Sequence, residues 1–120
     1  MGRPFSVVID CRDPKALAEF WAPALRYADS GWPHEPYVVL IDPEKGLDGN
    51  LVLLQRVDEA KQGKNRVHID LYAEDIEAEA DRLVGLGATR VSEPFDEHDA
   101  KWIVMNDPEG NEFCVCRGLG

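Results

Sequence analysis

Residues 67–75 read Val-His-Ile-Asp-Leu-Tyr-Ala-Glu-Asp, and they repeat the pattern of residues 5–13, Phe-Ser-Val-Val-Ile-Asp-Cys-Arg-Asp. In both stretches apolar and polar residues alternate, which is typical of a half-buried strand. Each stretch ends in an aspartate, Asp13 or Asp75, that is well placed to cap a following helix. The repeat therefore predicts two similar units, each beginning with a strand and a helix.

A helix is expected after each of these aspartates. Pro14 stands at the first helical position, where proline is favoured, and apolar residues then recur at helical spacing. Trp21 lies in this apolar stripe and is predicted to be a core residue. Because proline breaks the helical hydrogen-bond pattern, we expect a kink or a short second segment at Pro23.

Three short strand candidates follow each predicted helix. They lie at roughly 28–32, 37–41 and 50–56 in the first half, and at roughly 88–92, 101–105 and 111–117 in the second. The turn before the last strand is also repeated, as Asp-Pro-Glu at 42–44 and again at 107–109, each followed by Gly-Asn. These are turn-forming residues, so each half is expected to end in a hairpin.

The repeat predicts an α+β fold of two βαβββ modules, module one at about residues 4–60 and module two at about 66–118. A unit of about 55 residues has too little core for comfortable stability alone. We therefore expect the two modules to pack as a single domain over residues 1–120. Residues 61–65 are interpreted as no more than the polar loop between them.

The net charge of the chain disfavours some classes of binding partner. There are 13 Lys and Arg against 23 Asp and Glu, a formal net charge of −10. This charge repels phosphate backbones and anionic lipid, so we expect neither a nucleic-acid nor a membrane partner. The longest apolar runs, such as residues 51–54, are far too short to span a bilayer.

Cysteine usage points to a reducing compartment. The three cysteines, Cys11, Cys114 and Cys116, are odd in number, and two are only two residues apart on a predicted strand. Such a set does not make a disulfide framework. With no export signal in the first residues, a cytoplasmic location is expected.

Strand alternation predicts which face of the second sheet carries chemistry. In the stretch 67–75 the apolar set, Val67 included, is expected to face the helix, whereas His68 and Asp70 point the other way. The same phase adds Cys114 from the last strand and Trp102 from the strand before it. These side chains should line a groove or meet a partner.

The first half is expected to present a corresponding set. Ser6, Leu53 and Gln55 share the phase of the polar face. Asp10 and Asp70 are expected to occupy equivalent rows of the two modules.

Several further side chains are open to a structural or a functional interpretation. Trp102, Trp32 and Tyr37 are candidates for an aromatic wall around a ligand, and each is equally consistent with plain packing. His34 and His98 lie in stretches rich in proline and acidic residues and are expected to be exposed. Nucleophile-elbow, phosphate-loop and zinc-finger motifs are absent from the sequence.

Four stretches together carry a resemblance to a known family. They are Ile9-Asp10-Cys11-Arg12-Asp13-Pro14, Phe20-Trp21, Val67-His68-Ile69-Asp70-Leu71, and Asn106-Asp107-Pro108-Glu109-Gly110-Asn111-Glu112-Phe113. In this order and duplication, the chain resembles the vicinal oxygen chelate superfamily, the glyoxalase and bleomycin-resistance fold, and in particular its small bacterial glyoxalase-like domain proteins. The resemblance covers nearly the whole chain. It implies that the modules pair into a cupped eight-stranded mixed sheet, with helices on the outer face and a ligand cavity in the cup.

The resemblance also implies four sheet positions that bind a divalent ion in metal-dependent members, usually through His and Glu. In this chain they are Ser6, Leu53, His68 and Cys114. Leucine cannot ligate a metal and a neutral serine hydroxyl is a poor ligand, whereas a catalytic zinc site needs three protein ligands. We therefore predict no metal cofactor at this set.

Three functional hypotheses follow. The first is a metal-free small-molecule-binding protein whose ligand contacts are His68, Asp70, Gln55, Leu53, Trp102 and Cys114. The second is a metal-dependent lyase, isomerase or dioxygenase with a rebuilt metal site, in which His68 is the candidate catalytic residue. The third is a scaffold whose cup is filled by a dimer partner. Exchange of modules between chains is common in the family, so the resemblance also implies a homodimer.

Overall fold

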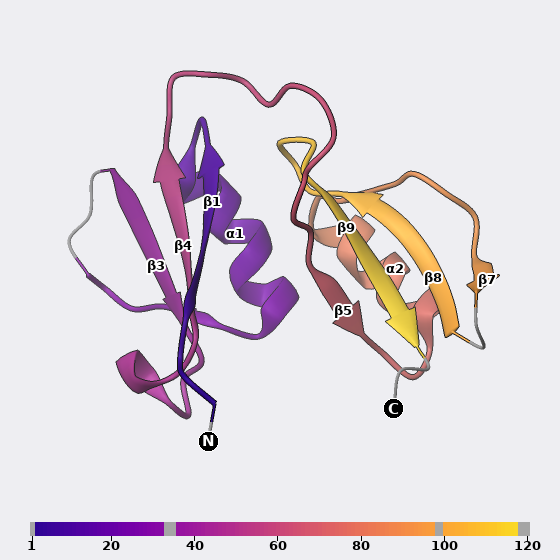
Figure 1. Cartoon of the computed structure of the whole chain (residues 1–120), viewed down its shortest axis with the longest axis horizontal. Coiled ribbons are helices and arrows are strands. Elements are labelled where there is room, and N and C mark those ends of the chain that lie inside the picture. Colours follow the sequence, from indigo (N-terminus) through magenta and orange to yellow (C-terminus); the bar gives the residue numbers. More distant parts are fainter. Residues whose placement is uncertain (1, 33–35, 98–99, 118–120) are drawn as a thin grey trace. The chain divides into compact units, whose positions relative to one another are not determined.

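The structure, a computed structural model, describes residues 2–32, 36–97 and 100–117. The chain divides into two units, Met1–Ala60 and Lys61–Gly120, which are called the first and second modules below. Each module contains one mixed sheet and one helix that packs against it (Figure 1).

The first module has a four-stranded sheet in the order β1-β4-β3-β2. Its elements are β1 (Ser6–Cys11), α1 (Pro14–Leu25), β2 (Ala28–Asp29), β3 (Tyr37–Ile41), a 3-10 turn (Gly46–Asp48) and β4 (Leu51–Arg56). β1 runs parallel to β4, and β3 runs antiparallel to it. α1 packs against β2, β3 and β4 and buries Phe20 and Trp21, whose rings meet edge to face with centroids 5.1 Å apart.

The second module repeats this arrangement with one more strand. Its elements are β5 (Asp70–Tyr72), α2 (Ile76–Leu86), β6 (Thr89–Arg90), β7 (Phe95–Glu97), β8 (Ala100–Asn106) and β9 (Glu112–Arg117). The sheet order is β5-β9-β8-β6, and β7 pairs with β8. β5 is parallel to β9, as β1 is to β4 in the first module.

The α+β class and the order of strand, helix and strands in each module are confirmed. All eight predicted strands are present, and β7 is a further strand that was not predicted from the sequence. We expected one eight-stranded sheet, whereas the described strands form one sheet in each module.

The strand at 67–75 is shorter than its sequence pattern suggested. Regular pairing begins only at Asp70, so Val67 and His68 precede β5. The expectation that Val67 faces the helix is wrong, because its side chain is 80% exposed. Alternation predicts orientation only where the backbone is held in a ladder, and Val67 lies before the ladder starts.

α1 runs through Pro23 as one element, so the expected second helical segment is wrong. Pro23 lies only two residues before the last residue of α1, Leu25. Arg26 then adopts the left-handed conformation and its N–H bonds back to the carbonyl of Pro23 at 3.2 Å. A proline this close to the C-terminal end disturbs little, because few helical hydrogen bonds remain after it.

Both helices start as the sequence predicts. The Asp13 carboxylate accepts the N–H of Ala16 at 3.1 Å, and the Asp75 carboxylate accepts the N–H of Ala78 at 3.0 Å. α2 ends at Leu86, and the next residue, Gly87, has a φ of +123°, which residues with a side chain rarely adopt. These caps fix where each helix begins to lie on its sheet.

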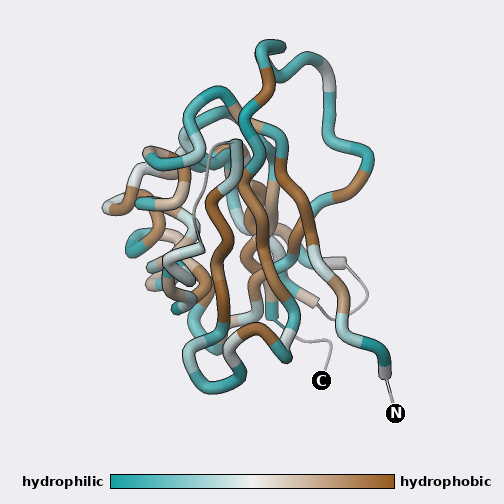
Figure 2. The backbone as a smooth tube through the Cα atoms, turned by 90° about the vertical axis from the view of Figure 1, so that its left-hand side faces the viewer, coloured by the Kyte–Doolittle hydropathy of each residue, from teal (hydrophilic) through white to brown (hydrophobic). Residues whose placement is uncertain are grey.

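Apolar side chains are concentrated on the strands and polar ones in the connections. In Figure 2 the strands of the first module are brown along much of their length, whereas the loops that join them are mostly teal. Within the described ranges, neither helix is long and apolar enough to cross a membrane.

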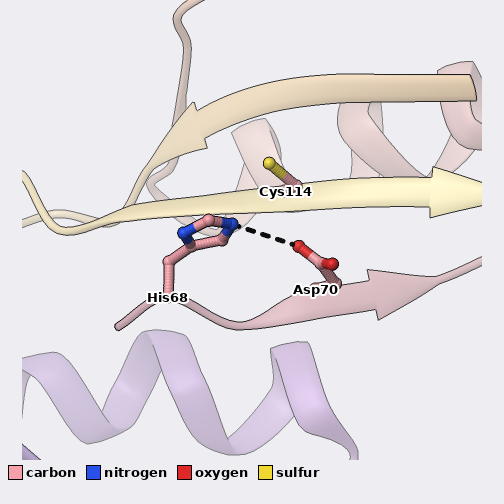
Figure 3. Close-up of side chains that lie close together, drawn as sticks. All are labelled: His68, Asp70 and Cys114. Carbon is pink, nitrogen blue, oxygen red and sulfur yellow. Dashed lines mark ion pairs between the residues drawn. The ribbon is translucent and has the colours of Figure 1, made fainter. Parts of the chain in front are cut away.

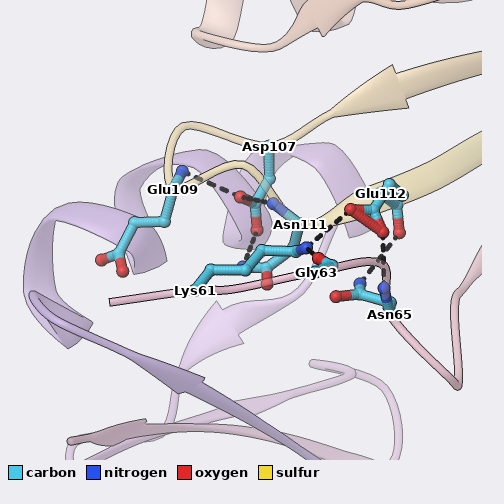
Figure 4. Close-up of polar contacts among 7 residues, drawn as sticks. All are labelled: Lys61, Gly63, Asn65, Asp107, Glu109, Asn111 and Glu112. Carbon is cyan, nitrogen blue, oxygen red and sulfur yellow. Dashed lines mark hydrogen bonds and ion pairs between the residues drawn. The ribbon is translucent and has the colours of Figure 1, made fainter. Parts of the chain in front are cut away.

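A buried aspartate holds the turn between β8 and β9. Asp107 is only 3% exposed, and its carboxylate accepts the backbone N–H groups of Glu109 and Asn111 and the side-chain amide of Asn111, at 2.8 to 2.9 Å (Figure 4). The equivalent turn of the first module uses Asp42, whose carboxylate accepts the N–H of Glu44 at 3.0 Å.

We expect Asp107→Ala to lower the free energy of unfolding by about 2 to 3 kcal/mol, because it leaves buried donors without their charged acceptor. Asp42→Ala is the matched control and should cost less than about 1 kcal/mol. Urea unfolding of the two variants measures both values. Equal losses would show that the carboxylate contacts of Asp107 do not hold the turn.

Candidate functional site

The packing of α2 divides the second sheet into two faces. The face toward α2 is apolar and almost fully buried, and it is formed by Ile103, Met105, Phe113 and Val115. Because side chains alternate along a strand, the residues between these point away from α2. We call this other side the distal face; it carries Asp70, Tyr72, Trp102, Val104, Asn106, Glu112, Cys114 and Cys116.

Three chemically active side chains gather at one edge of the distal face. The parallel register of β5 and β9 pairs Asp70 with Cys114, and His68 lies two residues before Asp70. Nε2 of His68 is 3.5 Å from Oδ1 of Asp70 (Figure 3). One nitrogen, one carboxylate oxygen and the Cys114 sulfur all lie within 4.8 Å of one another. The structure thus brings together three of the predicted site residues.

Solvent exposure decreases from His68 through Asp70 to Cys114. The His68 side chain is 43% exposed and that of Asp70 is 25% exposed, whereas Cys114 is 8% exposed as a residue. The imidazole and part of the Asp70 side chain are therefore accessible to a solute, whereas Oδ1 of Asp70 and the thiol are buried. An imidazole can donate or accept a proton near neutral pH, and a carboxylate accepts hydrogen bonds or binds cations.

The two thiols of β9 are kept protonated. Burial raises the pKa of Cys114, and the negative charge of Asp70 raises it further, while Lys64 acts weakly in the opposite direction. Burial, with Asp70 and Cys114 adding to it, raises the pKa of Cys116 to about 11. Since the thiolate is the nucleophile, neither cysteine is activated for attack.

Trp102 lies on the distal face as expected. It pairs with Cys116 across β8 and β9, and Cys116 pairs with Tyr72 across β9 and β5. One row of the sheet therefore places an aromatic residue on each side of a small, fully buried cysteine.

Residues 61–65, which begin the second module, are more than the plain loop that the sequence suggested. The Lys61 ammonium forms an ion pair of 2.7 Å with Glu112 and bonds the carbonyl of Gly63 (Figure 4). Asn65 donates its backbone N–H to the Glu112 carboxylate at 2.7 Å. These contacts lower the pKa of Glu112, chiefly through the bond from Lys61. They tie this segment to β9 and engage one of the acidic groups of the distal face.

The remaining predicted ligand residues, Leu53 and Gln55, lie on β4 of the first sheet. Leu53 pairs with Val8, and Gln55 pairs with Asp10.

The expected equivalence of Asp10 and Asp70 is wrong. Leu53 and Cys114 are matching positions, and their partners in the parallel ladders are Val8 and Asp70. Asp70 therefore corresponds to Val8, because each stands five residues before a helix-capping aspartate. The first module has no carboxylate at this position.

The two remaining aromatic candidates, Trp32 and Tyr37, are both exposed residues of the first module. His34 and His98 lie outside the described residues.

The polar side chains of Asn106 and Glu112 lie on the distal face, although neither residue was among the predicted ligand contacts. Asn106 and Glu112 pair with each other at one end of β8 and β9. Asn106 lies four residues after Trp102 on β8, so its side chain points to the same face. Strand alternation alone would therefore have predicted that Asn106 lies on the distal face.

Two mixed sheets, each with one helix on one face and a strand order that repeats between modules, define the vicinal oxygen chelate fold. A family model described as the glyoxalase-like domain matches residues 6–116. The chain belongs to this family. A search of curated proteins finds no match.

Solved structures with this fold share little sequence with the chain. A glyoxalase/bleomycin resistance protein/dioxygenase family enzyme from Burkholderia phytofirmans PsJN is 18% identical, with a TM-score of 0.73 over 95% of this chain and 97% of that one. The fosfomycin resistance protein FosX from Mesorhizobium loti is 14% identical, with a TM-score of 0.67 over 97% and 90%. TioX from Micromonospora sp. ML1 is 16% identical, with a TM-score of 0.65 over 98% and 100%. At these identities the likeness shows the fold alone.

The four metal-binding positions that the fold implies do not fit a metal ion in this chain. Leu53 has no donor atom, and Ser6 offers only a neutral hydroxyl. The other two positions, His68 and Cys114, lie near a third donor, Asp70, that is not one of the four. The second module therefore holds a different set of three donors, with nitrogen, oxygen and sulfur atoms.

We expect iodoacetamide to modify Cys116 in the folded protein at pH 8 at least ~100-fold more slowly than in the urea-unfolded chain. A pKa raised from 9.0 to about 11 reduces the thiolate fraction by about this factor, and the rate should rise as pH approaches that value. Asp70→Asn should speed the modification of Cys114, because it removes a charge that raises the pKa of this thiol. Peptide mapping by mass spectrometry measures both rates, and equal rates in folded and unfolded protein would contradict the burial of Cys116.

Proposed function

We propose that the chain is a metal-free small-molecule-binding protein that holds an organic ligand against the distal face of its second sheet. The observation that carries this proposal is the group formed by His68, Asp70 and Cys114, in which two polar side chains stand accessible above a buried thiol. Ligand sites are typically apolar surfaces with a few convergent polar groups. Trp102 and Val104 supply apolar surface beside this group.

Binding is favoured over nucleophilic catalysis by the state of the thiols. Cys114 lies near an imidazole and a carboxylate, an arrangement that in some enzymes activates a cysteine. Here burial and the charge of Asp70 raise the pKa of Cys114, which is the opposite of activation. The three side chains are therefore best suited to orient a ligand by hydrogen bonds.

We expect His68→Ala to weaken binding of any compound that stabilises the protein through the distal face, by roughly tenfold, because one orienting hydrogen bond is lost. A panel of hydrophobic and cationic small molecules, screened by thermal shift, supplies the compounds. Lys101→Ala is the matched control, since Lys101 is exposed on β8 and has the strand phase of the opposite face. Unchanged affinity in His68→Ala for every stabilising compound would contradict the proposal and favour a scaffold whose face is covered by a partner.

A metal-dependent lyase, isomerase or dioxygenase is the second candidate. It is favoured by the three donor atoms within 4.8 Å of one another in the second module. Three protein ligands satisfy the minimum for a catalytic zinc site. His68, Asp70 and Cys114 would hold the ion, which would supply Lewis-acid chemistry.

Metal analysis separates the two candidates. We expect untagged protein, purified without chelator and then exposed to zinc, nickel, manganese and ferrous iron, to retain far less than one ion per chain. Near-stoichiometric metal that is lost in His68→Ala would contradict the metal-free proposal. Cys116→Ser is the control, because Cys116 lies one row away from the donor group.

We also propose that the protein acts as a cytoplasmic homodimer. The three cysteines are buried thiols with no disulfide bond between them, which suits a reducing compartment. The homodimer is proposed because exchange of modules between chains is common in this family. Sedimentation equilibrium measures the oligomeric state directly.

A further inference from the structure

Three buried polar atoms of the second module have no hydrogen-bond partner in the part of the chain that the structure describes. They are Oδ1 of Asp70, Nε1 of Trp102 and Oδ1 of Asn106. Nε2 of His68 lies 3.5 Å from Oδ1 of Asp70, but the two atoms do not have hydrogen-bond geometry. Buried polar groups are nearly always hydrogen-bonded, so three exceptions in one small module need a physical explanation.

All three atoms belong to residues of the distal face. Trp102 lies in the row of Cys116, Asp70 lies in the row of Cys114 and Val104, and Asn106 lies in the row of Glu112. Rows on one face are about 7 Å apart and neighbouring strands about 4.8 Å apart, so the backbone of Asp70 lies about 12 Å from each of the other two, which are about 14 Å apart on β8. All three atoms are closed to solvent, so a molecule of two or three rings would contact them only once the side chains above them shift.

The three atoms differ in their hydrogen-bonding role. Two are acceptors, a carboxylate oxygen and an amide oxygen, and one is the indole donor of Trp102. A complementary molecule must therefore bring N–H donors to Asp70 and Asn106 and an acceptor to Trp102.

The charge on this face favours a cation at the acceptor end. Glu112 is already paired with Lys61, so it attracts a cation weakly. The ion pair of the Asp70 carboxylate is with His68, which is charged only when protonated, and Lys64 lies near enough to Cys114 to affect the pKa of this thiol. The anionic carboxylate with a free acceptor atom is thus at Asp70.

We propose that the ligand of the distal face is a flat cationic molecule whose N–H groups bond Asp70 and Asn106 and whose acceptor atom bonds the indole N–H of Trp102. This inference rests on the proposed function and specifies the chemistry of its ligand. The three atoms are left unpaired in the free protein because the ligand completes them.

The first test needs no ligand. If Oδ1 of Asn106 is unpaired in the free protein, Asn106→Leu removes an uncompensated polar group and should leave Tm unchanged or raise it by about 2 to 5 °C. Asn111→Leu is the matched control and should lower Tm, because the Asn111 amide donates to Asp107. A fall of Tm in Asn106→Leu as large as that in Asn111→Leu would show that water or another group already satisfies Asn106, and it would overturn the inference.

The second test uses a matched series of probes: methoxynaphthamidine, methoxynaphthamide and methoxynaphthoate. They share one ring system and one ether acceptor and differ in charge. The indole N–H resonance of Trp102, identified by its absence in Trp102→Phe, reports binding in ¹⁵N-labelled protein. We expect the amidine to shift this resonance and to bind at least ~10-fold more tightly than the carboxylate, because Asp70 is anionic.

Asp70→Asn should remove most of the preference for the amidine over the amide. Asp96→Asn, which neutralises an exposed carboxylate on β7, should leave the preference unchanged. Tighter binding of the neutral or anionic probe at Trp102 would overturn the cationic assignment while leaving the proposed binding function intact. Failure of all three probes to shift the Trp102 resonance would overturn the inference, and the wider compound panel would then decide the proposed function separately.

Discussion

The packing of α2 on one face of β8 and β9 is the constraint on which the rest of the second module depends. It requires that the residues beneath α2 be apolar, and Ile103, Met105, Phe113 and Val115 meet this requirement with almost no exposure. Charged residues of the same strand phase, such as Lys101, lie at the exposed ends of the strands. Polar side chains can then lie only on the distal face or in loops, since a buried polar group without a partner is costly. The candidate site is thus placed by the packing of the core.

The two modules share this architecture but differ in the chemistry of the face away from the helix. At three matching positions the first module has Ser6, Val8 and Leu53, whereas the second has His68, Asp70 and Cys114. A hydroxyl and two hydrocarbons offer little to orient a ligand, while an imidazole, a carboxylate and a thiol offer three kinds of polar contact. The two modules thus share the backbone arrangement, and the second one carries the imidazole, the carboxylate and the thiol at these positions.

The parts of the fold that the sequence predicted are those governed by local physics. Asp13 and Asp75 cap their helices because a side-chain oxygen at that position meets the free N–H groups of the first turn. The alternation in β8 and β9 gave the correct face for Trp102 and Cys114. Expectations failed where local pattern and tertiary context disagree. Val67 continues the alternation but lies before the ladder, and Pro23 falls so near the end of α1 that the helix runs through it.

The sequence by itself determined the repeat, the order of its elements, the apolar stripes and the donor types available on each strand, because these follow from neighbouring residues and the periods of helix and strand. Only the tertiary structure decided which donors meet. The parallel register of β5 and β9 brings Asp70 beside Cys114, although 44 residues separate them in the chain, and it makes Val8 the counterpart of Asp70 in place of Asp10. Register depends on how distant strands pack against a shared helix, and burial of polar atoms such as Nε1 of Trp102 depends on that packing too.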